Sequence, residues 1–295
     1  MVDQKHKNRL SEIAKSLFRI ERLPSIPHVL HQLVEAVGDN RTDAAKLERI
    51  IESDQGLASK VLSLANSPFY GFSQRITTIR RAVVALGYKE LQLLALGTCL
   101  TKVFDPGMTP PQFDAKGLWT HSLSVSWFAR ELSEKARYDS PGEILVAGLM
   151  HDIGKLILST HLHEDLSRII EKLDNGEPYY QAEEELGVPH TLLGYMLATK
   201  WGLPSIHLLA IRYHHNPFAD NYCPFSTSLI ALADREVKRL GFGLIHKSRP
   251  IDNDYILKQT RLEEDMVEEV ARNAKEALPK LIGGWQEGLF DGQHA

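Results

Sequence analysis

The sequence has little cysteine and no long apolar run. Its 295 residues include 2 cysteines, Cys99 and Cys223, which do not form a CxxC pair. This argues against a disulfide-rich secreted protein and indicates a reducing compartment. No segment reaches the ~18 apolar residues of a membrane-spanning helix, and the charged start MVDQKHKNRL lacks the apolar core of a signal peptide. We therefore expect a cytoplasmic protein that does not cross a membrane.

Other features are scarce as well. Segments that alternate between apolar and polar residues, as half-buried strands do, are rare. The formal net charge is −4 with acids and bases interspersed, so the basic stripe typical of nucleic-acid-binding proteins is missing. The motifs GxSxG, GxxxxGK[ST] and GxGxxG are absent, which argues against a serine hydrolase, a P-loop NTPase and a dinucleotide-binding protein. We expect no nucleic-acid partner.

Apolar residues instead recur every three or four positions through most of the chain, which is typical of amphipathic helices. The pattern predicts an all-α fold. In the first hundred residues it predicts helices that end at Gly38 and Asn66 and two more that meet near Gly87. Further along, the predicted helices span 118–137, 142–158, 162–174, 178–186, 190–201, 205–215, 225–240 and 261–282.

A proline- and glycine-rich segment, DPGMTPPQFDAKG at residues 105–117, cannot sustain a helix and predicts a connector. We therefore divide the chain into an N-terminal helical half at 1–107, a second helical half at 108–245 and a C-terminal helical extension at 246–295. The amphipathic helix of the extension could pack on the core or join two copies of the chain, and packing is the simpler prediction. A monomer and a homodimer both stay open.

The segment GLMHDIGKLIL places His151 and Asp152 side by side in an apolar stretch. A buried charge is costly unless it is paired or binds a metal ion. Lys155 lies four residues after His151, so a helix would carry both on one face. A lysine beside a metal site is well placed to meet an anionic ligand such as phosphate.

Further histidines and an aspartate lie on helix faces predicted to point inward. His121 has apolar neighbours on its face, and His190 opens a helix after a proline. His214 and His215 close a helix, where the partial negative charge of the C-terminus favours cations. Asp234 shares the face of apolar residues in LIALADREV.

Each of these residues has an ordinary interpretation when taken alone. A buried histidine usually bonds to a backbone carbonyl, an inward aspartate usually caps a helix or pairs with an arginine, and Lys155 could be a surface lysine. Together they form a mixed nitrogen and oxygen set that suits iron, manganese or nickel, and also zinc or magnesium. Two ions ~3.5–4 Å apart are a recurring device for phosphate-ester hydrolysis.

The order His121, His151-Asp152, Asp234 resembles the H…HD…D pattern of the HD superfamily of metal-dependent phosphohydrolases. The added histidines and the string HDIGK resemble the HD-GYP branch, whose members hydrolyse cyclic di-GMP with two or three metal ions. The resemblance implies catalytic roles for Asp152, which would bridge two ions, and for Lys155, which would contact a phosphate. The metal ligands that it implies are His121, His151, Asp152, His190, His214, His215 and Asp234.

Residues 23–91 resemble the HDOD family of bacterial signalling proteins. The matching segments are LPSIP, IIESDQGLASKVLSLANSPFYG and AVVALG, the last preceded by an isoleucine after a gap of two residues. The resemblance extends from about residue 20 to about residue 240. It implies an all-α fold in which an N-terminal helical subdomain packs on an HD-type helical bundle. Many HDOD proteins have lost the HD ligands and are regarded as interaction modules, whereas this sequence keeps the ligand types.

The sequence also departs from the HD-GYP pattern. After His215 it reads NPFADNYCPF rather than Gly-Tyr-Pro, and Gly117 stands where members with three metal ions have Glu. We therefore expect two ions, and the departure argues against cyclic di-GMP as substrate. Two functions stay open: a metal-dependent phosphohydrolase or phosphodiesterase acting on a nucleotide, and a non-catalytic regulatory module that keeps a metal or ligand site and binds kinases or response regulators. A metal site kept only for folding is a third interpretation.

Overall fold

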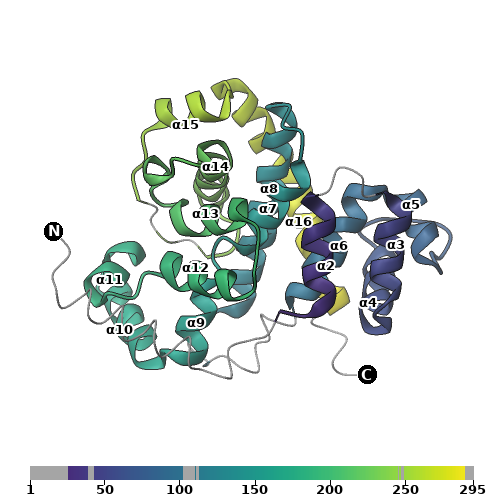
Figure 1. Cartoon of the computed structure of the whole chain (residues 1–295), viewed down its shortest axis with the longest axis horizontal. Coiled ribbons are helices and arrows are strands. Elements are labelled where there is room, and N and C mark those ends of the chain that lie inside the picture. The colour runs from purple at the N-terminus through teal and green to yellow at the C-terminus, as the bar shows by residue number, and fades with distance from the viewer. Residues whose placement is uncertain are drawn as a thin grey trace.

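The computed structural model describes residues 26–38, 43–101, 110, 113–244, 246 and 249–289. These residues form helices and loops without a strand among them, which confirms the all-α prediction. Figure 1 shows two groups of helices on either side of a central set formed by α7, α8 and α16. The first three residues of LPSIP and most of the predicted connector lie outside the described residues. None of the described helices has the length and apolar content needed to cross a bilayer.

The first group of helices surrounds α6, whose residues from Leu91 to Leu100 are all buried. Helices α3, α4 and α5 are each capped at the N-terminus by a side chain that accepts a hydrogen bond from a backbone N–H of the first turn. The capping residues are Asp43, Asp54 and Thr78 respectively. Such caps satisfy donors that the first turn of a helix leaves unpaired. The helices are α2 (His28–Gly38), α3 (Ala44–Glu52), α4 (Gln55–Ala65), α5 (Ile79–Leu86) and α6 (Tyr88–Thr101).

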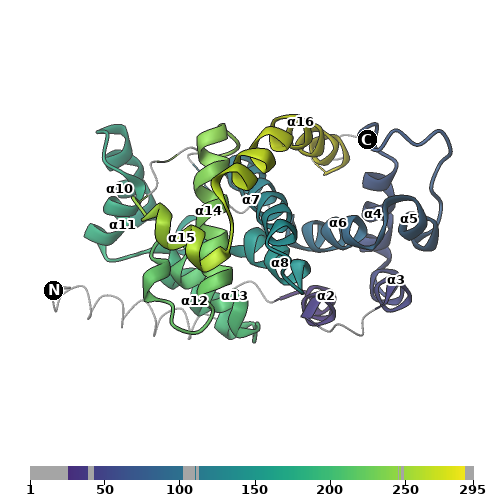
Figure 2. The same cartoon turned by 90° about the horizontal axis from the view of Figure 1, so that it is seen from above.

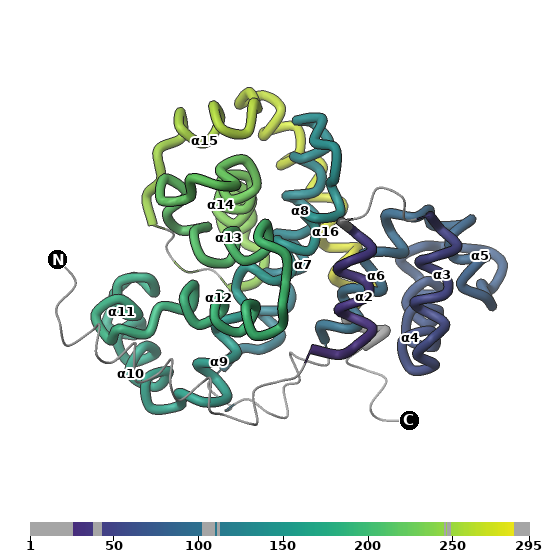
Figure 3. The backbone as a smooth tube through the Cα atoms, viewed as in Figure 1, coloured from purple at the N-terminus to yellow at the C-terminus, as the bar shows by residue number. Residues whose placement is uncertain are grey.

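The second group, together with α7 and α8, forms the bundle that holds the candidate site. Helix α7 packs against α8 and α14, and α12 packs against α9 and α13. The helices are α7 (Ala115–Lys135), α8 (Pro141–Met150), α9 (Gly154–His161), α10 (His163–Asp174), α11 (Tyr179–Leu186), α12 (His190–Lys200), α13 (Ser205–Tyr213) and α14 (Pro224–Leu240), with a short 3₁₀ turn η2 (Pro217–Ala219). Figure 3 follows this path as a tube.

The prediction of one continuous helix over 142–158 is wrong. The chain turns at residues 151–153, between the end of α8 and the start of α9. The backbone N–H of Ile153 and that of Lys155 donate to carbonyls three residues earlier, on Met150 and Asp152. A turn of this kind keeps an apolar residue every three or four positions, so periodicity alone did not distinguish it from a helix.

The C-terminal part contains α15 (Asn253–Thr260), which we did not predict, and α16 (Glu264–Leu289). Helix α16 contacts α7 and α4, which confirms that the predicted tail helix packs on the core (Figure 2). The buried Trp285 ring lies 5.3 Å from that of Trp119, measured between ring centroids. It also fills the space beside Gly97, where a Cβ atom would lie 2.3 Å from the indole. The division of the chain at 107 and 245 stays a prediction.

Candidate metal centre

The turn between α8 and α9 carries His151 and Asp152, and both side chains are fully buried. Nδ1 of His151 donates to the carbonyl of Gly148 at 2.8 Å, so Nε2 faces the interior of the bundle. Burial lowers the pKa of His151, but the carboxylates of Asp152 and Asp234 outweigh it and raise the pKa to about 9. The surroundings of Nε2 therefore favour a positive charge at that atom.

One group of possible ligand atoms consists of His121, His151 and Asp234, which come from α7, the turn and α14. Nε2 of His121 lies 2.9 Å from Oδ1 of Asp234, and Nε2 of His151 lies 3.7 Å from the same oxygen. All ligand atoms of this group lie within 4.8 Å of one another. Such a group is compact enough for a single cation.

A second group consists of Asp152, His190, His214 and His215. His190 opens α12, and His214 and His215 follow the last residue of α13. Nε2 of His190 lies 3.0 Å from Oδ1 of Asp152, and Nε2 of His214 lies 3.6 Å from that oxygen. Nδ1 of His214 donates to the carbonyl of Ile211 at 3.0 Å, which turns Nε2 inward.

Asp152 lies between the two groups, and each of its oxygens faces one of them. Oδ1 faces His190 and His214, whereas Oδ2 lies 3.4 Å from Nε2 of His151 and 3.8 Å from Nε2 of His121. A shared carboxylate is the usual way in which proteins link two ions. All seven residues that the sequence predicted as ligands thus lie in one cluster, and their role as ligands stays a prediction.

The residues of this cluster fit divalent transition metals. Among the described residues, Oδ1 of Asp152 and Nε2 of His151 are buried and make no hydrogen bond, which is costly unless a further group binds them. The pKa of each aspartate lies well below its usual value, because nearby cations outweigh the effect of burial. Burial lowers the pKa of His214 to about 4, so its imidazole is neutral, the form that binds metals.

Two lysines, of which Lys155 is buried, each contact one of the two aspartates. Nζ of Lys155 lies 2.5 Å from Oδ2 of Asp152, and Nζ of Lys238 lies 2.8 Å from Oδ2 of Asp234. Lys155 also lies over the ring of Tyr179, 5.0 Å from its centroid. The expected contact of Lys155 with a phosphate stays a prediction, and the contact described here is with a carboxylate.

Sequence reasoning missed Glu183 and Lys238. Oε2 of the buried Glu183 lies 2.5 Å from Nδ1 of His190. Lys238 could have been found, because it follows Asp234 by one helical turn. Glu183 had no such signal, since it lies on α11 and reaches His190 across a loop.

Gly154 couples the turn to α12. A Cβ atom at this position would lie 1.9 Å from the carbonyl oxygen of His190 and 2.5 Å from the backbone nitrogen of Gly194. Only glycine allows such an approach of two backbones. The glycine of HDIGK therefore brings Asp152 and His190 to their short separation.

Comparison with known proteins agrees with this architecture. The family model of the HDOD domain matches residues 23–217. An uncharacterised protein of Treponema pallidum (strain Nichols) is 27% identical over 228 residues, which are 75% of this chain and 43% of that protein. The chain thus spans less than half the length of this curated relative.

Three solved structures share the fold. An HDOD domain protein of unknown function from Geobacter sulfurreducens has a TM-score of 0.81 and 23% identity, over 96% of this chain and 99% of that one. A candidate signal transduction protein from Marinobacter aquaeolei VT8 has a TM-score of 0.76 and 21% identity, over 96% of this chain and 66% of that one. A candidate phosphohydrolase from Shewanella amazonensis SB2B has a TM-score of 0.68 and 21% identity, over 91% of this chain and 97% of that one.

Proposed function

Because the chain belongs to the HDOD domain family, we propose that it is a member that holds two divalent metal ions and hydrolyses a phosphate ester of a nucleotide. The observation that carries this proposal is the position of Asp152 between two groups of buried ligand atoms. Iron, manganese and nickel suit the donor set best, and zinc or magnesium is compatible with it.

The residues would divide into two ligand sets that share Asp152. His121, His151 and Asp234 would hold one ion, and His190, His214 and His215 would hold the other. When bound, such ions activate water and neutralise the charge of a phosphate. Oδ1 of Asp152 and Nε2 of His151 are buried without a hydrogen bond among the described residues, which supports this assignment.

Lys155 would bind the phosphate of the substrate. Its ammonium carries three N–H donors, and the contact with Asp152 uses one of them. The remaining donors are available to an anionic oxygen. Burial of the lysine strengthens such an interaction, because water does not screen it.

The direct experiment measures metal content and hydrolysis with protein prepared without a chelator or a polyhistidine tag. We expect two transition-metal ions per wild-type chain, their loss in Asp152→Ala, and release of phosphate or nucleotide from a broad panel of nucleotides and phosphodiesters by the wild type only. A wild-type protein that is metal-free and takes up neither manganese nor iron would contradict the metal site. A loaded protein without turnover on the panel would contradict the activity alone.

The second candidate function is a regulatory module that binds a kinase or a response regulator. It is favoured by the group α2–α6, which contributes no side chain to either ligand set. A partner captured equally by wild type and Asp152→Ala would support this function. In that case hydrolysis would also be missing from the loaded protein.

A further inference from the structure

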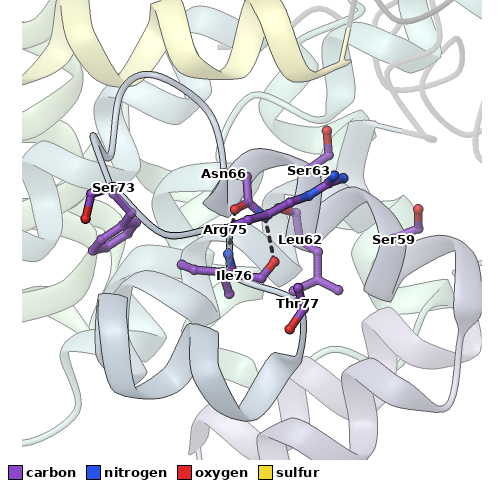
Figure 4. A pocket seen from close by; sticks show the side chains of 9 residues that line it. Ser59, Leu62, Ser63, Asn66, Ser73, Arg75, Ile76 and Thr77 are labelled. Atoms are coloured by element: carbon purple, nitrogen blue, oxygen red, sulfur yellow. Dashed lines mark hydrogen bonds between the residues drawn. The ribbon is translucent and has the colours of Figure 1, made fainter.

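An open groove of about 910 Å³ lies in the N-terminal group of helices. It runs between α4 and the segment 66–78 that leads to α5 (Figure 4). None of its lining residues belongs to the metal-ligand cluster. Its volume is within the ~300–1,000 Å³ of sites for small organic ligands. The lining residues that matter here are Ser59, Leu62, Ser63, Phe72, Arg75 and Thr77.

Hydrogen bonds hold the shape of the groove. The side-chain amide of Asn66 donates to the carbonyls of Leu62 and Ile76, at 2.7 and 2.8 Å. Its oxygen accepts the N–H of Ile76 at 2.7 Å. These three bonds fasten the segment to α4, as Figure 4 shows. The groove therefore exists before any ligand binds, which reduces the entropy cost of binding.

The groove lies in a positively charged part of a negatively charged protein. Between Gln55 and Lys89 the sequence contains no aspartate or glutamate, whereas the whole chain has a net charge of −4. Two basic side chains of this stretch are neutralised elsewhere, because Arg80 pairs with Glu48 and Lys89 pairs with Glu134. The basic residues of the stretch are Lys60, Arg75, Arg80, Arg81 and Lys89.

Arg75 is the charged residue that lines the groove. Within the described part of the chain, no carboxylate oxygen lies within 4.0 Å of its guanidinium. In the view of Figure 4 its side chain extends over Asn66 toward the side of the groove that carries Ser63. A guanidinium with a serine hydroxyl on the same side of a groove can bind a phosphate group, which accepts hydrogen bonds from both.

Phe72 supplies an aromatic surface at the groove. Its side chain is 41% exposed, which is unusual for phenylalanine. The ring stacks on that of Tyr70, with centroids 6.3 Å apart and an interplanar angle of 13°, and Tyr70 packs edge-on against Phe69. The stack fixes the orientation of the Phe72 ring while much of the ring stays open to solvent. A planar base gains stability by stacking on such a ring.

We propose that this groove is a second ligand site, which binds a nucleotide through its phosphate and its base. Arg75 and the hydroxyl of Ser63 would bind the phosphate, and Phe72 would contact the base. The site needs no metal ion and lies on different helices from the metal centre. Its occupation is therefore independent of hydrolysis.

The test is calorimetric titration of the full chain, treated with a chelator, with AMP and GMP as probes. We expect saturable binding of at least one probe by the wild type and by Asp152→Ala. Arg75→Gln should weaken binding about tenfold or more through loss of the charge-assisted bonds, and Phe72→Ala should weaken it about fivefold or more through loss of stacking. Arg81→Gln, an exposed arginine of α5 that does not line the groove, is the matched control and should bind as the wild type does.

Four results would overturn the proposal. The first is an absence of AMP and GMP binding to the wild type, and the second is equal affinity of the wild type and Arg75→Gln. The third is inorganic phosphate binding as tightly as AMP, which would identify a simple anion site. The fourth is binding of a short single-stranded oligonucleotide without binding of either mononucleotide, which would identify a nucleic-acid surface. Phe72, Arg75 and Arg81 are exposed, so these variants are expected to fold, whereas Asp152 is buried. Circular dichroism checks the folding of all four variants.

Discussion

Oε2 of Glu183 lies 2.5 Å from Nδ1 of His190, and neither side chain is accessible to solvent beyond 2%. The carboxylate accepts a hydrogen bond from Nδ1–H, so the Nε2 lone pair is directed toward Asp152, whose Oδ1 lies 3.0 Å away. Partners of this kind fix the tautomer and orientation of a metal-binding histidine. Glu183 is therefore a positioning residue for the second ligand set.

Glu183→Gln should lower the affinity for one of the two ions about 10- to 100-fold, because the amide cannot hold the imidazole as a carboxylate does. The affinity for the other ion should change little. Titration of the metal-free protein with manganese, followed by calorimetry, resolves the two steps. Glu184→Gln is the matched control, since Glu184 is half exposed and pairs with Arg249 on the surface. Equal loss of both ions would argue against this assignment.

Lys155→Met should separate metal binding from hydrolysis. The substitution removes the positive charge beside Asp152 but no ligand atom. Bound ions should therefore be retained. Hydrolysis should fall about 100-fold or more, as when one donor to a developing negative charge is removed. Metal analysis and turnover on the same preparation test this. The control is Lys172→Met, because Lys172 is partly exposed and pairs with Glu177 and Glu185. Loss of the ions together with the activity would show that Lys155 acts on the ligand set alone.

Gly154→Ala should destabilise the protein and disturb the metal centre together. The added Cβ would lie 1.9 Å from a backbone oxygen of α12, so two helices must separate. Overpacking of this kind costs about 1–3 kcal/mol, and we expect metal content to fall with it. Urea denaturation and metal analysis measure both effects. Gly283→Ala is the control, because a Cβ there meets no atom within 4 Å and alanine favours a helix. A stable Gly154→Ala variant with full metal content would contradict this expectation.

His207 should make stability depend on pH. Burial lowers its pKa to about 4 from 6.5, and its Nδ1 has no hydrogen-bond partner in the described part of the chain. The unfolded chain therefore binds a proton more readily than the folded one, and the stabilisation present above pH 6.5 is lost as the pH falls toward 4. Between pH 7 and pH 5 the wild type should lose about 2 kcal/mol more stability than His207→Leu. Urea denaturation at both pH values measures the difference, and parallel losses would exclude His207 as the source.

The sequence allowed the all-α fold and the seven clustered residues to be predicted, because both depend on short-range patterns and on a recognisable order of residue types. The break after Met150 was hidden, since a tight turn at His151 preserves the apolar period. Helix α15 was missed because its eight residues are mostly polar. The hydrogen bond between Glu183 and His190 and the groove around Arg75 depend on contacts between separate elements. The apolar periodicity of the sequence does not predict such contacts.

The packing of α16 has a consequence for the order in which the protein acquires its structure. Trp285 and its neighbour Gly97 are about 190 residues apart in the sequence, and α16 follows every other described helix. During synthesis the apolar surface beside Gly97 must therefore stay uncovered until nearly all of the described bundle has left the ribosome. Contacts between such distant segments form slowly, and an exposed apolar surface favours aggregation meanwhile. The nascent chain is thus most prone to aggregation just before α16 emerges.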